Sequence, residues 1–143
     1  MKKINGILAM ACVALMIACD SGKRVTAEEL IGRWSIVEVG GEAVKAEKAF
    51  LEFVKEGKTL RLHGNAGCNL MNTEMIIDEK KPAALSFSVP RVTMMACPDL
   101  ETESKILNAF EHVTQVKSDK TETRLHLADK EGKSMLTLEK EAP

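Results

Sequence analysis

The chain has 143 residues, of which 45% are hydrophobic and 29% are charged, and its formal net charge is −1. This balance is typical of one folded domain and excludes a disordered chain. A nearly neutral chain also lacks the basic footprint of a nucleic-acid-binding protein. Aromatic residues make up only 3% of the sequence, which argues against a surface that stacks bases or sugar rings.

The first 19 residues have the anatomy of an export signal. Two lysines precede an apolar run over residues 7–17, which is too short for a resident transmembrane helix. The run ends in MIAC, residues 16–19, which resembles a bacterial lipobox. The resemblance implies a lipoprotein signal peptide over residues 1–18 and acyl chains, such as palmitate, on Cys19. The alternatives are an ordinary secretory signal and an uncleaved anchor.

Residues 19–29 are mostly small and polar, and we expect them to form a lipidated tether ahead of a domain over residues 30–140. Acyl chains on Cys19 would attach the protein to a membrane without spanning it. We therefore expect a lipid-anchored protein of the bacterial cell envelope, on the periplasmic face or at the outer membrane.

The domain begins with alternating apolar and polar residues, which predict short β-strands. Gly57 and Gly132 lie in short polar stretches between pairs of these strands, where they predict hairpin turns. Leu60 and Leu62 are expected to point inward, and so is Val89 at the end of a later strand. The expected strands lie within residues 32–44, 49–54, 59–64, 70–77, 83–89, 114–118, 123–129 and 134–140.

The periodicity changes to that of a helix in residues 98–113. Glu101 and Glu103 near its start favour a helix N-terminus, and we expect the acidic side chains of this helix to be solvated. The predicted fold is α+β: an antiparallel, strongly curved sheet of about seven or eight strands, a partial barrel, with one helix packed on it. The apolar residues at helical spacing are Leu100, Ile106, Leu107, Phe110 and Val113.

Two cysteine-containing motifs, GNAGCN at residues 64–69 and TMMACP at residues 93–98, lie about 30 residues apart. With the helix and hairpin that follow, they resemble the META domain, the HslJ-like family of bacterial envelope lipoproteins, over residues 31–139. The resemblance implies a β-rich, non-catalytic domain linked by name to the heat-shock response. Met94 departs from the family pattern, in which a basic residue is common. The matching residues are Gly67, Cys68, Asn69, Thr93, Met95 and Cys97.

The sequence has four cysteines. Cys12 would be removed with the signal peptide and Cys19 would carry lipid, so Cys68 and Cys97 remain as a pair in the exported domain. An exported compartment favours a disulfide between them, and Gly67 would allow a tight turn beside it. Buried, reduced thiols are the second possibility. The third is chemistry, with His63 as an activating base.

A zinc site would need both cysteines together with His63 and His126, but the sequence lacks C-x-x-C and H-x-x-x-H spacing. We therefore expect no metal, no cofactor and no catalytic residue.

The four methionines at 71, 75, 94 and 95 are expected in the core, and an adaptable apolar groove is the alternative. The sequence as a whole predicts a monomeric, non-catalytic binding or stress-related structural module whose partner is an envelope protein. The first alternative is a half-barrel that binds a lipid tail or a peptide. The second is a thiol-redox protein that uses Cys68 and Cys97.

Overall fold

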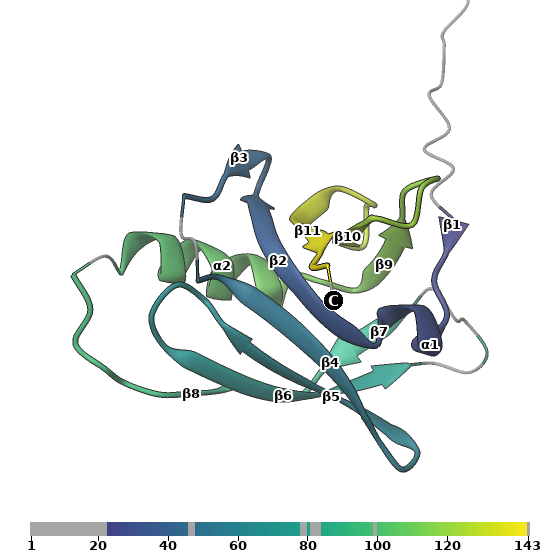
Figure 1. Ribbon diagram of the computed structural model, residues 1–143, viewed down its shortest axis with the longest axis horizontal. Helices are drawn as coiled ribbons and strands as arrows, with labels where there is room; N and C mark the ends of the chain where they lie inside the picture. The colour runs from purple at the N-terminus through teal and green to yellow at the C-terminus, as the bar shows by residue number, and fades with distance from the viewer. Residues whose placement is uncertain (1–22, 46–47, 78–79, 81–83, 99, 143) are drawn as a thin grey trace, which may run out of the picture.

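Antiparallel strands in one strongly curved sheet make up most of the molecule (Figure 1). The structure is a computed structural model, and it describes residues 23–45, 48–77, 80, 84–98 and 100–142. The helices are α1 (Ala27–Leu30) and α2 (Glu101–Glu111). The strands are β1 (Lys23–Arg24), β2 (Gly32–Val39), β3 (Glu42–Ala43), β4 (Phe50–Glu56), β5 (Thr59–Asn65), β6 (Leu70–Ile77), β7 (Leu85–Phe87), β8 (Arg91–Val92), β9 (Gln115–Ser118), β10 (Arg124–Ala128) and β11 (Ser134–Lys140).

The sheet curves until its two ends nearly meet. Its strand order is β1-β9-β10-β11-β2-β4-β5-β6-β7, with β3 added beside β2 and β8 beside β6. A bridge between Ala84 and Gln115 and a bond of 3.0 Å from Leu85 N to Thr114 O bring β7 next to β9. Eight strands of three or more residues therefore enclose a nearly closed barrel. The predicted α+β fold with a partial barrel is confirmed.

Strand periodicity positions the core as expected in the hairpins. Leu60 and Leu62 are buried in β5, and Gly57 turns the chain between β4 and β5 with a φ of 62°. The inward prediction for Val89 is wrong, because its side chain is 89% exposed. β7 ends at Phe87, and the proline that follows Val89 has no backbone N–H with which to continue a ladder.

Helix α2 closes one side of the core. Ile106 and Phe110 are buried, and the ring of Phe110 lies 4.3 Å from that of Phe87, centre to centre. Leu100 was expected on the apolar face but is half exposed, because it is the residue before the first helical turn. The largest fully buried side chains are Trp34, Phe53, Phe110, Leu30, Leu51, Leu62, Met71, Ile106, Leu125, Leu127, Leu136 and Leu138.

The folded part of the chain reaches into the expected tether. β1 pairs with β9, and α1 begins at a capping box formed by Thr26 and Glu29. The signal segment and Cys19 lie outside the described residues. Neither of the helices in the described part of the chain has the length and apolar character of a membrane-spanning segment.

Candidate functional site

The turn between β5 and β6 carries the first cysteine motif. Gly64 at the end of β5 is packed closely, because a Cβ there would lie 2.9 Å from both Leu51 Cδ2 and Phe50 O. The side chain of Asn65 fixes the turn. Its Oδ1 accepts from Gly67 N at 2.7 Å, and its Nδ2 donates to the backbone carbonyl of Cys68 at 3.3 Å. Gly67 has a φ of 120°, which side chains disfavour.

This turn brings Cys68 to Cys97 in the loop before α2. Their sulfur atoms lie at disulfide-bonding distance, and their Cα atoms are 6.2 Å apart, within the usual range for a disulfide. The two residues are 29 positions apart in the sequence. The pair therefore joins the β5–β6 turn to the loop that leads into the helix.

Asn69 lies at the centre of a closed polar network beside the two cysteines and is 3% exposed. Its Oδ1 accepts from Met95 N at 2.7 Å and from Thr93 Oγ1 at 2.9 Å. Its backbone N and its Nδ2 each donate to a carboxylate oxygen of Glu103, both at 2.7 Å. Thr93 Oγ1 also accepts from Leu70 N at 3.0 Å. The side chain of Asn69 thus ties the turn to two distant segments, the loop before α2 and the helix itself.

Glu103 is buried, with 6% exposure, although it was expected to be a solvated helix residue. It occupies the first turn of α2, and its two oxygens receive the donors of Asn69. The pattern of apolar residues along the helix carried no sign of this contact, because the partner comes from another part of the chain. The only signal in the sequence was an acidic residue in a first helical turn, which the helix dipole also explains.

The two histidines of the alternative zinc site are engaged elsewhere. The ring of His63 pairs through Nδ1 with Asn72 Oδ1, and the ring of His126 lies 3.4 Å from hydroxyls of neighbouring strand residues. Among the described residues, the potential metal-ligand atoms that gather within 4.8 Å of one another are the sulfurs of Cys68 and Cys97 and a carboxylate oxygen of Glu103. A cysteine binds a metal as its thiolate, and a disulfide has no thiolate. With the two sulfurs bonded, the remaining ligand of this group is the Glu103 carboxylate, which already accepts hydrogen bonds from Asn69.

The sequence matches the family model described as META domain over residues 28–142. The chain belongs to the META domain family. A solved structure described as "NMR structure of the protein from Burkholderia xenovorans" is similar in fold, with a TM-score of 0.65 and 18% sequence identity, and the alignment covers 100% of both chains. No curated protein is significantly similar to this chain in sequence.

The second motif of this META domain forms a loop that displays apolar side chains. Met94 is 98% exposed and Met95 is 53% exposed, so the core prediction is wrong for these two methionines. It is correct for Met71 and Met75, which are buried in β6. The bond from Met95 N to Asn69 and the cysteine pair both tie this loop to the β5–β6 turn. Polar groups of the motif thus fix the loop, and its methionines face solvent.

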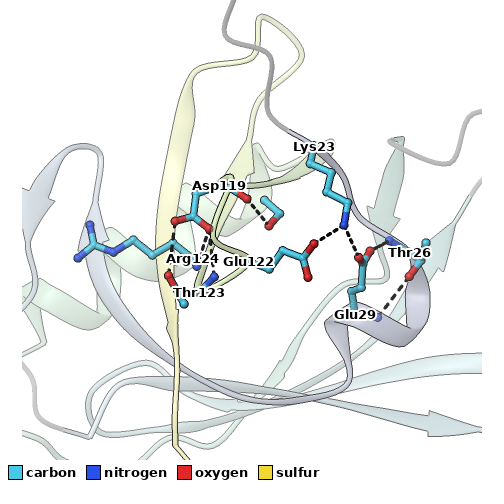
Figure 2. A network of polar contacts seen from close by, with 8 residues as sticks. Lys23, Thr26, Glu29, Asp119, Glu122, Thr123 and Arg124 are labelled. Atoms are coloured by element: carbon cyan, nitrogen blue, oxygen red, sulfur yellow. Dashed lines mark hydrogen bonds and ion pairs between the residues drawn. The ribbon is translucent and has the colours of Figure 1, made fainter.

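The first described residues of the chain, which begin ahead of the matched META domain, lie against the turn between β9 and β10 (Figure 2). Lys23 Nζ pairs with Glu29 at 3.1 Å and also with Glu122, and these two bonds raise the pKa of Lys23, the one to Glu122 most. Asp119 organises the turn, because its carboxylate accepts from Thr121 Oγ1 at 2.6 Å and from Thr123 N at 3.1 Å. The ion pairs of Lys23 therefore attach the start of the described chain to the β9–β10 turn.

We expect the carboxyl of Glu29 to titrate far below its ordinary range. The Thr26 N–H, then the Lys23 ammonium and the Thr26 hydroxyl, lower its pKa from 4.5 to about 2. A lowered folded-state pKa stabilises the fold above the unfolded-state value, and this contribution is lost as pH falls from about 4.5 toward 2. Carbon-detected NMR titration of the side chain should show this low midpoint. Lys23→Gln should move the midpoint upward and Lys45→Gln should not, whereas a parent midpoint near 4.5 would contradict the assignment.

Proposed function

We propose that this META domain protein is a lipoprotein of the bacterial envelope and that its domain is a non-catalytic binding module. Its exposed motif loop would contact an envelope protein. The observation that carries this proposal is that the polar side chains of the two motifs are bonded inside the molecule while the methionines of the second motif are exposed. The polar groups of Asn69 and Thr93 are used inside the molecule, while Met94 and Met95 of the same loop are exposed.

The chemistry of the motif supports a scaffold more than a reaction. A catalytic cysteine needs a thiolate and a base that activates it. Here Cys68 and Cys97 lie at bonding distance, and the neighbouring carboxylate of Glu103 accepts hydrogen bonds from Asn69. Exposed methionine is a flexible apolar side chain that adapts to a partner surface. These features favour recognition over turnover.

The position of the expected anchor supports the same proposal. Cys19 precedes Lys23 by four residues, so a lipid on Cys19 would hold β1 within about 14 Å of the membrane. Figure 1 shows β1 and α1 at one end of the molecule and the connection from β8 to α2 at the other. A domain anchored in this way would present Met94 and Met95 away from its own membrane.

The half-barrel alternative receives no comparable support. It requires inward-facing apolar side chains that line a ligand cavity. Leu62, Met71 and Leu127 point inward and are fully buried, and they pack with the other residues of the hydrophobic core. The inner surface of the curved sheet therefore serves as the interior of the fold.

Site-specific photo-cross-linking in intact bacterial cells tests this proposal. The full chain would carry a photoreactive amino acid at position 94, or at position 133 as an exposed control on the β10–β11 turn. We expect a discrete adduct with an envelope protein from position 94 and none from position 133, because only the first side chain lies in the proposed contact.

The same experiment tests the anchor when it is repeated with Cys19→Ala. This variant should leave the membrane fraction, and the adduct from position 94 should decrease with it. A variant that stays equally membrane-bound would refute lipidation at Cys19. Equal adducts from positions 94 and 133 would refute the loop as the binding surface.

A further inference from the structure

A second polar site lies on the outer face of the sheet, where the pairing of β6 changes partner. β7 pairs with β6 through Met75–Ile77, and β8 pairs with it through Met71–Asn72. Between them the chain passes through Val89 and a proline, and Val89 stands out from the surface. A pocket of about 260 Å³ opens at this step, lined in part by Arg61, His63, Asn72, Glu74, Val89 and Arg91.

Strand register aligns three polar side chains across this pocket. His63 of β5 is directly opposite Asn72 of β6, and Asn72 is directly opposite Arg91 of β8. Directly opposed residues of neighbouring strands place their side chains about 5 Å apart on the same face. The ring of His63 pairs through Nδ1 with Asn72 Oδ1, which fixes the ring within this row. The row ends at a guanidinium.

The positive charges in the pocket are not equivalent. Arg61 forms ion pairs with Glu56 at 2.9 Å and with Glu74 at 3.6 Å, so its charge is largely offset. Within the described part of the chain, no hydrogen bond or ion pair engages the side chain of Arg91. Arg91 therefore brings a free guanidinium, with its planar set of N–H donors, to a pocket that already holds an oriented imidazole.

We propose that this pocket binds a small oxyanion, a phosphate or carboxylate group, through Arg91 with His63 beside it. A guanidinium binds such groups through two parallel charge-assisted hydrogen bonds. The carboxylate of Glu74, which also lines the pocket, limits the site to a group of low charge. The anion is either free or part of a lipid headgroup. The site does not depend on the motif loop or on the lipid anchor.

The test uses the full chain in neutral detergent, labelled with ¹⁵N on its arginines. Sodium phosphate or sodium acetate is added while sodium chloride holds the ionic strength constant. We expect the Nε–H resonance of Arg91 to shift saturably with one or both anions, and that of Arg124 to stay in place because Glu139 pairs with it on β11. Phosphate affinity, read independently from ³¹P line broadening, should fall about 10-fold or more in Arg91→Gln, which loses charged hydrogen bonds.

Arg124→Gln is the matched control, and its phosphate affinity should be unchanged. Micelles that contain phosphatidylglycerol distinguish the sources of the anion: they displace phosphate if a lipid headgroup fits the pocket and do not if only a free anion fits. A resonance of Arg91 that does not saturate, or an equal loss of affinity in both arginine variants, would overturn the proposal.

Discussion

Replacing Asn69 by alanine is expected to lower the free energy of unfolding by about 3–5 kcal/mol, since several buried groups each lose a hydrogen bond whose absence costs about 1–3 kcal/mol. The side chain donates to the buried carboxylate of Glu103 and accepts from the backbone of Met95 and the hydroxyl of Thr93. Alanine would leave all three groups without this side-chain partner, although the backbone N–H of residue 69 would still donate to Glu103, and each buried polar group left unpaired is costly. Because a domain of this size has about 5–15 kcal/mol of stability in total, the variant should lie close to unfolding at growth temperature.

Urea unfolding measures this effect, and strand β6, which follows the turn that carries Asn69, offers a matched control. Asn72→Ala removes an amide that is exposed and pairs with His63, and it should change stability by less than about 1 kcal/mol. The double variant Asn69→Ala, Glu103→Ala should cost less than the sum of the two single changes, because the buried carboxylate is gone. Additive effects, or equal losses in Asn69→Ala and Asn72→Ala, would contradict the assignment of the network.

Local sequence patterns were sufficient for most of the long strands and for the curved sheet. Alternation in β5 and glycines in the hairpin turns are properties of a few neighbouring residues, so the burial of Leu60 and Leu62 could be predicted. The end of β7 could not, because the alternation runs on to Val89 although the ladder does not. The packing of β1 against β9 also depends on residues far along the chain, which explains why a tether was expected there.

The candidate site shows the same limit more clearly. The motif residues were identified together by their resemblance to a family, but spacing alone gave no role to Asn69 or to Glu103. Their contact joins residues 34 positions apart, and it exists only because the fold brings α2 to the β5–β6 turn. Met94 and Met95 were assigned to the core because they lie beside predicted strand positions. In the structure the polar groups of the loop bond inside the molecule, and the two methionines are exposed.

The second large effect is expected from the cysteine pair. The double variant Cys68→Ser, Cys97→Ser should lose about 3.5 kcal/mol of unfolding free energy, because a link across a loop of this length restricts the unfolded chain. Reductant should destabilise the parent protein by a similar amount and should leave the double variant unchanged. Urea unfolding with and without dithiothreitol makes this comparison, with the double variant as its own control.

Alkylation of the denatured protein without reductant, followed by mass analysis of peptides, decides the state of the thiols directly. A bridge predicts no label on Cys68 or Cys97 in protein isolated from an oxidising compartment. Labels on both would contradict the bridge and give a different meaning to the neighbouring Glu103, whose carboxylate lies within 4.8 Å of both sulfurs. Two free thiolates beside a carboxylate are a ligand set for a soft metal ion, and the scaffold role proposed for the motif would then have to give way to metal or redox chemistry.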